Sequence, residues 1–320
     1  MVTLRGSSFH RDPTARPGFT SSSLHSQLFS PPRGSAVAES RVRYCQNDSD
    51  LYSVESFIEL GAELKLDVLD IRTDKGWGSA PGDTSGGKSS EVTEEYLAGV
   101  KLLALQRGLS IGYLASIGHF TGTPEENAAL VAAAKEDVDT AVLMGAPLLR
   151  CFTSCAGDDY GPDVQAREIE CFQEICDFAA TRGIAVGCQN HPSTGAHMLR
   201  IKEAVNRPNF TFVLDTGQWV GGANKNSGPT NEVTYDWMRE CAPYAAHVRA
   251  KFFCVESGKE SWLDYARIVG ILDEAGFNGT LGIVFEGGDV NKGISDREVF
   301  EICAAELQVL TAARRSAPKL

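Results

Sequence analysis

The feature that most constrains the fold is a regular alternation of short strand-like and helical segments. From Arg41 onward, eight β-prone runs recur, at residues 42–46, 66–72, 110–115, 148–152, 184–189, 210–215, 245–250 and 280–286. The segments between them carry apolar residues at spacings of three and four, which is typical of amphipathic helices. Eight strands, each followed by a helix, in roughly 280 residues match the count and length of an α/β domain closed as a (β/α)8 barrel.

Local signals agree with this pattern. Thr93 and Thr123 precede acidic residues in the way that helix N-caps do. Glycines close four of the helices before the next strand: Gly108, Gly145, Gly183 and Gly276. A doubly wound open sheet is the main rival, but it requires a glycine-rich phosphate turn after the first strand, and the sequence has none there. The sequence therefore predicts a TIM barrel, with its site at the C-terminal ends of the strands.

Residues 1–40 differ from the rest, because they are rich in Ser, Pro and Arg and show no sustained periodicity. We interpret them as a flexible extension, with an organellar targeting segment as the alternative, and residues 41–320 as the single barrel domain. The nine cysteines are scattered without a CxxC motif, which predicts buried free thiols in a reducing compartment such as the cytoplasm.

The charge balance limits the partners. A net charge of −12 and a pI near 5.0 argue against a nucleic-acid partner. No apolar run reaches the length of a membrane span. We therefore expect a small-molecule substrate, and self-association into a homo-oligomer stays open.

Polar residues end four consecutive strands in the second half of the chain. The segments are Gln189–His191, Asp215–Gln218, His247–Lys251 and Val284–Gly288. Strand interiors are normally apolar, so strands that turn polar at the same end predict side chains converging on one site.

Each of these residues has a site interpretation and a structural alternative. Gln189 and His191 share a parity and could both face the barrel axis, whereas His191 could instead belong to an ordinary Asn-His-Pro loop. Asp215 ends an apolar strand, so we expect it to bind a metal or a cation, the alternative being a cap on the loop that follows.

The last two strands supply two cations and a second carboxylate. His247, Arg249 and Lys251 alternate and could point to one side, unless Lys251 leaves the strand for solvent. Glu286 and Asp215 form a pair that could bind a divalent cation or could face Arg249 and Lys251. Lesser candidates at other strand ends are Asp70, Arg72, His119 and Arg150.

Several short motifs resemble the sugar phosphate isomerase/epimerase superfamily, the xylose-isomerase-like TIM barrels that include ketose 3-epimerases, inosose dehydratases and endonuclease IV. The resemblance runs from about Arg41 to the C-terminus and rests on the order and spacing of these motifs. They lie at residues 57–62, 145–150, 189–192, 214–218 and 285–287.

The resemblance implies a metal set of Glu, Asp, His and Glu on the fifth to eighth strands. Asp215 and Glu286 match it, but Gln189 replaces the first Glu and Arg249 replaces the His. Gln189 could still coordinate a metal ion weakly, whereas Arg249 cannot. Both replacements make the site more positive, which disfavours the divalent Mn, Mg or Zn ion that the resemblance implies. Gln218 also replaces the His that follows the Asp-Thr-Gly of the endonuclease branch, which together with the acidic charge disfavours that branch.

The resulting hypothesis is an isomerase or epimerase that removes a proton next to a carbonyl of a sugar, inosose or related oxygenated substrate. Glu286 is the expected base, with His191 or Lys251 as alternatives, and Arg249 and Lys251 stabilise the oxyanion. We expect the substrate to be bound by Gln189, His247, Arg72, His119 and Gln218. The alternatives are a metal-independent lyase or cyclase of specialised metabolism and a non-catalytic sugar-binding relative.

Overall fold

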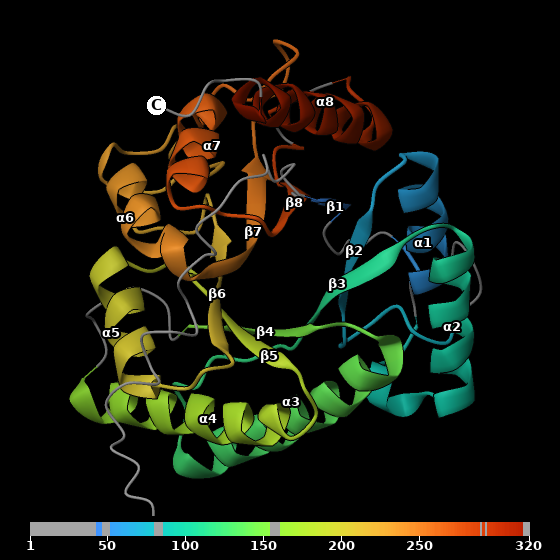
Figure 1. Ribbon diagram of the computed structural model, residues 1–320, viewed down its shortest axis with the longest axis vertical. Helices are drawn as coiled ribbons and strands as arrows, with labels where there is room; N and C mark the ends of the chain where they lie inside the picture. The colour runs from blue at the N-terminus through green and yellow to red at the C-terminus, as the bar shows by residue number, and fades with distance from the viewer. Residues whose placement is uncertain are drawn as a thin grey trace, which may run out of the picture. The chain divides into compact units, whose positions relative to one another are not determined.

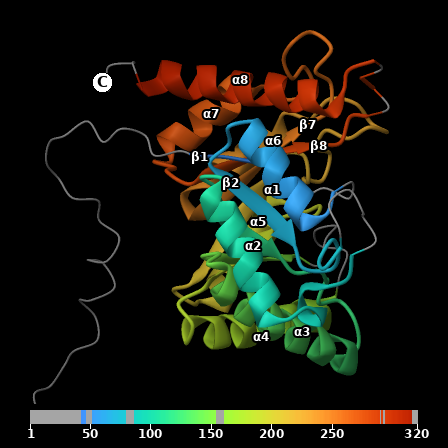
Figure 2. The same cartoon turned by 90° about the vertical axis from the view of Figure 1, so that its right-hand side faces the viewer.

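The computed structural model describes residues 43–46, 52–79, 86–153, 161–288, 290–291 and 293–315. The predicted extension at residues 1–40 lies outside them. The described strands form one closed parallel barrel in sequence order, with β1 paired to β8. This confirms the predicted (β/α)8 fold, and Figures 1 and 2 show the helices surrounding the strands.

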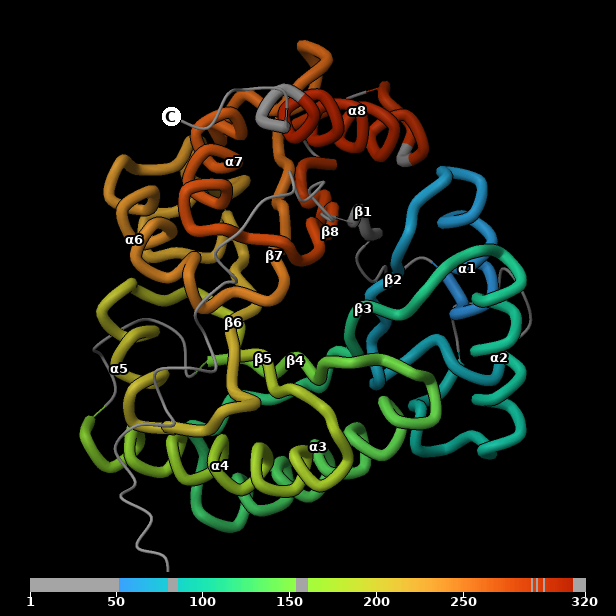
Figure 3. Tube along the Cα trace, in the orientation of Figure 1, coloured from blue at the N-terminus to red at the C-terminus, as the bar shows by residue number. Residues whose placement is uncertain are grey.

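Strands and helices alternate along the chain, as the tube in Figure 3 traces. The elements are β1 (Arg43–Gln46), α1 (Val54–Glu63), β2 (Val68–Arg72), η1 (Ser89–Glu91), α2 (Glu94–Gln106), β3 (Ser110–Ala115), α3 (Pro124–Met144), β4 (Leu148–Phe152), α4 (Pro162–Ala180), β5 (Ala185–Gln189), α5 (Gly195–Val205), β6 (Phe210–Asp215), α6 (Val233–Cys241), η3 (Ala242–Tyr244), β7 (Ala245–Phe252), α7 (Tyr265–Glu274), β8 (Thr280–Phe285) and α8 (Asp296–Arg315).

The predicted helix signals act as expected. Thr93 and Thr123 are the N-caps of α2 and α3, and each side chain accepts a hydrogen bond from a backbone N–H of the first turn. All four closing glycines have positive φ, between 71° and 76°, a conformation that only glycine adopts without strain. Each of these turns therefore sets the direction in which the chain enters the next strand.

Strand β7 differs from the prediction. It runs to Phe252, two residues beyond the predicted end, because Lys251 and Phe252 pair with Val284 and Phe285 of β8. Lys251 is 1% exposed. The alternative in which Lys251 leaves the strand for solvent is therefore wrong.

Two apolar layers hold the barrel. The main core lies between strands and helices, with residues such as Ile58, Phe172 and Ile283 fully buried. A small second cluster consists of Tyr113, Ala115, Leu148 and Val213. Several polar side chains on the barrel strands are also buried, and such groups need hydrogen-bond partners; they include Arg150, Gln189, Asp215, His247 and Arg249.

The cysteines agree with the predicted free thiols. Among the described side chains seven cysteines are free, and all of them except Cys254 are buried. Burial raises the pKa of the Cys151 thiol to about 12, so that thiol stays protonated at neutral pH. Within the described helices, no segment is both long and apolar enough to cross a membrane.

Candidate functional site

The predicted convergence of polar residues occurs at the C-terminal ends of β5 to β8. Gln189 ends β5, Asp215 ends β6, Arg249 and Lys251 lie on β7, and Glu286 follows β8 directly. In the barrel register Asp215 lies beside Arg249. These five residues form the strand-end cluster.

Asp215 is fixed first by its own loop. Its Oδ1 accepts hydrogen bonds from the backbone N–H groups of Gly217 (3.0 Å) and Gln218 (3.2 Å). The Asn190 side chain donates to the carbonyls of Asp215 (2.9 Å) and Gln218 (2.8 Å) and accepts from the Asp215 N–H (2.8 Å). Asn190 therefore positions this carboxylate, a role that the sequence did not predict.

The other oxygen of Asp215 faces the cluster. Oδ2 accepts from Arg249 Nε at 3.1 Å and from Gln189 Nε2 at 3.3 Å, and it lies 3.3 Å from Lys251 Nζ. Burial alone would raise the pKa of Asp215, but the Lys251 and Arg249 charges and the loop amides outweigh it, so the pKa lies below its ordinary value. Asp215 is therefore an anion that binds cations, as predicted, and its loop contacts give it the capping role as well.

Lys251 joins the two carboxylates. Its ammonium group hydrogen-bonds Glu286 Oε1 and forms an ion pair with Asp215. Its backbone is fixed on both sides, because its N–H donates to Thr216 Oγ1 (2.9 Å) and its carbonyl accepts from the Tyr265 hydroxyl (2.6 Å). The Lys251 side chain is 1% exposed, whereas that of Glu286 is 46% exposed. Lys251 thus holds a solvent-facing carboxylate against a buried one.

Arg249 reaches across the barrel. Its Nη1 donates to the Tyr113 hydroxyl at 2.6 Å, and the Tyr113 ring meets the His247 ring edge-on at 4.9 Å between centroids. Sequence reasoning missed Tyr113. A tyrosine hydroxyl inside an apolar strand needs a partner, which is the signal that could have found it.

Gln189 presents a free oxygen. An ionised carboxylate can only accept hydrogen bonds, so the amide nitrogen of Gln189 faces Asp215 and Oε1 points away from it. Oε1 is buried and has no hydrogen-bond partner among the described residues. A buried acceptor of this kind suits a hydroxyl donor from a ligand.

His247 lies one layer deeper than Arg249. Its Nε2 is 2.9 Å from Asp70 Oδ2, at an angle that does not make a hydrogen bond. Gly282 leaves the space for this pair, because a Cβ there would come within 2.9 Å of both groups. The structure thus places the predicted substrate-binding His247 and the lesser candidate Asp70 together, below the strand-end cluster.

The remaining predicted residues lie at the ends of earlier strands. His191 is beyond the end of β5, and its ring packs with those of Phe152 (4.4 Å) and His119 (5.3 Å). Burial lowers the pKa of His191 to about 4, so its imidazole is neutral at physiological pH. Arg150 stacks over Phe152 at 4.1 Å, and Arg72 makes a two-bond ion pair with Asp74 outside the strand-end cluster.

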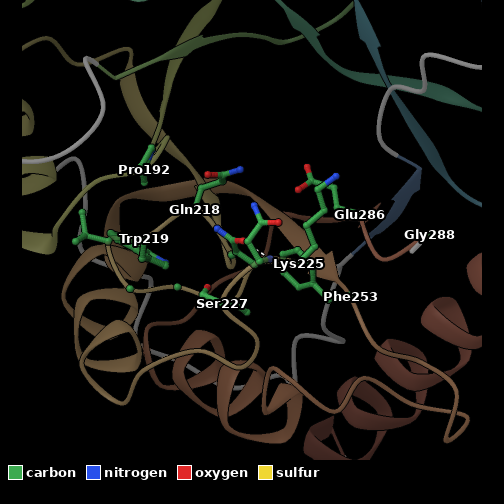
Figure 4. A pocket seen from close by; sticks show the side chains of 15 residues that line it. Pro192, Gln218, Trp219, Lys225, Ser227, Phe253, Glu286 and Gly288 are labelled. Carbon is green, nitrogen blue, oxygen red and sulfur yellow. Dashed lines mark hydrogen bonds between the residues drawn. The ribbon is translucent and has the colours of Figure 1, made fainter. Parts of the chain in front are cut away.

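A hollow of about 970 Å³ opens beside the cluster. Figure 4 draws its lining, with the Gln218 and Glu286 side chains projecting from its two sides. The loop after β6 supplies most of the remaining lining, including Trp219 and Lys225. That loop is rich in Gly and Asn, and its sequence carried no signal for these two residues.

The donor chemistry does not fit a divalent metal ion at the cluster. Arg249 cannot coordinate one, the Lys251 ammonium lies between Asp215 and Glu286, and Asp215 Oδ2 already faces three N–H donors. Throughout the part of the chain that the structure describes, no three His, Cys, Asp or Glu side chains are grouped to hold a metal.

Comparison with known proteins supplies the family. A family model described as xylose isomerase-like TIM barrel matches residues 68–300, whereas no curated protein matches the chain. A solved L-ribulose 3-epimerase superposes with a TM-score of 0.63 at 14% identity, covering 87% of this chain and 99% of its own.

Two further solved structures are similar. D-psicose 3-epimerase with D-tagatose, from Clostridium cellulolyticum H10, has a TM-score of 0.63 at 13% identity and covers 85% of this chain and 99% of its own. A xylose isomerase-like TIM barrel protein from Mycobacterium smegmatis, in complex with magnesium, has a TM-score of 0.63 at 15% identity, with 86% and 99% covered. The family match spans most of the barrel, and the chain belongs to the xylose isomerase-like TIM barrel family.

Proposed function

We propose that this protein is an isomerase or epimerase-like enzyme that removes a proton next to a carbonyl of a sugar, inosose or related small oxygenated substrate. The observation that carries this proposal is the position of Glu286. It is a carboxylate at the open end of the barrel, held through one oxygen by a buried lysine and lining a hollow of about 970 Å³. Several structural neighbours are sugar 3-epimerases, which supports the same substrate class.

In this proposal Glu286 is the base. Lys251 occupies its Oε1, which leaves Oε2 to accept a proton from substrate carbon. Negative charge then develops on the substrate carbonyl oxygen. Two contacts of the Lys251 ammonium are accounted for within the described residues, so a third N–H can donate to that oxygen.

Gln189 and the ring cluster position the substrate. The Gln189 Oε1 accepts from a substrate hydroxyl, because it is a buried acceptor that no described group satisfies. His191 acts as a neutral hydrogen-bonding group rather than as the principal base, since a pKa of about 4 makes it a weak proton acceptor. Gln218 lines the hollow opposite Glu286 and contacts the part of the substrate further from the barrel axis.

A second candidate is a lyase on the same site. Gln189 cannot take a proton, so two bases acting on opposite faces of the substrate are not available from Gln189 and Glu286. A single base suits isomerisation or the elimination of a β-hydroxyl better than a two-base epimerisation. The two candidates differ in product, because elimination releases water and leaves an α,β-unsaturated ketone or its tautomer, whereas isomerisation keeps the formula.

The test is Glu286→Gln in the full chain. We expect proton exchange between substrate and deuterium oxide, followed by NMR across a panel of ketoses and inososes, to fall about 100-fold or more. Glu301→Gln is the matched control, because Glu301 is an exposed carboxylate that pairs only with Arg297 among the contacts described. Unchanged turnover in Glu286→Gln would show that Glu286 is not the base.

A further inference from the structure

The strand-end cluster carries its own cations. Two carboxylates, Asp215 and Glu286, form ion pairs with two basic side chains, Arg249 and Lys251, so the formal charges of the cluster sum to zero. A divalent ion added between the carboxylates would leave an excess of two positive charges in a largely buried site, which is costly.

The contacts of Asp215 make the same point atom by atom. Its Oδ1 is occupied by two loop amides, and its Oδ2 faces Arg249, Gln189 and Lys251 within 3.3 Å. A metal ion bound to Asp215 would have to compete with these donors for the carboxylate oxygens. The Lys251 ammonium stands between the two carboxylates that such an ion would bridge.

From these contacts we infer that the Lys251 ammonium, supported by the Arg249 guanidinium, is the resident cation of this site and takes the place of a divalent metal ion. The inference deepens the proposed function, because it names the group that polarises the substrate carbonyl. Both of its carboxylate contacts engage the ammonium group directly, so Lys251 acts as a cation and hydrogen-bond donor rather than as an amine nucleophile.

The lysine is held for this role by the strand rather than by the ligand. Its backbone hydrogen bonds to Thr216 and Tyr265 fix the residue before any substrate arrives. Gly217 leaves room for the side chain, because a Cβ at that position would lie 2.8 Å from Lys251 Cγ. The ammonium group is therefore preorganised, as electrostatic stabilisation of an oxyanion requires.

The test measures Mn²⁺ binding to the full chain, by electron paramagnetic resonance and calorimetric titration after treatment with a chelator. We expect the unmodified protein to bind no stoichiometric Mn²⁺. The triple variant Gln189→Glu, Arg249→His, Lys251→Ser restores an oxygen and nitrogen ligand set, and we expect it to gain one bound equivalent.

A double variant isolates the lysine. Gln189→Glu with Arg249→His keeps Lys251, so we expect it to bind far less Mn²⁺ than the triple variant. The inference is overturned if the folded triple variant gains no Mn²⁺ or if the double variant binds as tightly as the triple. If neither variant folds, the unmodified protein decides, because one tight Mn²⁺ that Asp215→Asn abolishes would overturn the inference. None of these readouts uses turnover, so they stand apart from the test of Glu286 as base.

Discussion

Replacing the Asp137 carboxylate by an amide is expected to stabilise the barrel at neutral and alkaline pH. Asp137 lies on α3, is 9% exposed, and accepts a hydrogen bond from Thr73 Oγ1 at 3.1 Å. Burial raises its pKa from 3.8 to about 6, although hydrogen bonds from Ser116 and Thr73 act in the opposite direction. The carboxylate is therefore held in a place that prefers the neutral form.

The sign and size of the stability change in Asp137→Asn follow from proton linkage. The folded protein binds the proton on Asp137 more tightly than the unfolded chain does, so this group favours folding in acid and opposes it as the pH rises from about 4 to about 6. A shift of about two pKa units corresponds to about 3 kcal/mol above that range. We expect Asp137→Asn to gain up to that amount at pH 8 and only about 0.5 kcal/mol at pH 4, because the amide resembles the protonated carboxyl.

The assay is denaturant unfolding followed by circular dichroism, at several pH values. Asp215→Asn is the matched control, since it is the same isosteric change at a carboxylate whose pKa is lowered. The stability that Asp215 supplies is present above its unfolded pKa and is lost as the pH falls through its folded pKa. Its removal leaves Arg249 and Lys251 without their shared anion and should cost about 3–5 kcal/mol at pH 8. The reasoning is refuted if Asp137→Asn destabilises at pH 8, or if both variants change stability in the same direction.

Three further outcomes can be measured. Gly282→Ala should lower the free energy of unfolding by about 1–3 kcal/mol, because the added Cβ would come within 2.9 Å of two buried polar side chains. Its control is Gly99→Ala, whose Cβ meets nothing within 4 Å and which should raise the free energy of unfolding by about 0.5–1 kcal/mol. Tyr113→Phe should lose about 1–3 kcal/mol because it removes the acceptor of Arg249 Nη1, and no loss would mean that the contact is dispensable. The His191 ring resonances should stay constant above about pH 5.5, since its pKa is about 4, and an NMR midpoint near 6.5 would contradict its burial.

The fold was predictable because its signals are local. Helix N-caps such as Thr123 and closing glycines such as Gly145 act within a few residues of the chain, and strands β3, β4 and β6 begin and end where the sequence predicts. The end of β7 was not predictable in this way. It is set by pairing with Val284 and Phe285, more than thirty residues away along the chain, and pairing of this kind leaves no mark in the strand's own sequence.

The residues of the candidate site differ in the same way between local signals and contacts distant in sequence. Asp215 and Glu286 could be identified because a carboxylate at the end of an apolar strand is costly without a partner. The long-range contacts of the barrel interior could not be identified in this way, because His247 meets Asp70, and Arg249 meets Tyr113, across 136 or more positions of sequence. Parity arguments show which side a residue faces, but not which of several facing charges it meets.

For Lys251, the contacts that parity could not predict decide its chemical role. From the sequence, the substitution of Arg249 for histidine was the reason to doubt a metal ion, and Lys251 was one cation among several. Two additional residues of β7 bring its ammonium group between Asp215 and Glu286. Because those residues pair with β8, which Glu286 directly follows, the proposed base and its cation are positioned by one set of backbone hydrogen bonds. A change that shortens this pairing should therefore disturb both groups at once, which a site assembled around an exchangeable metal ion would not require.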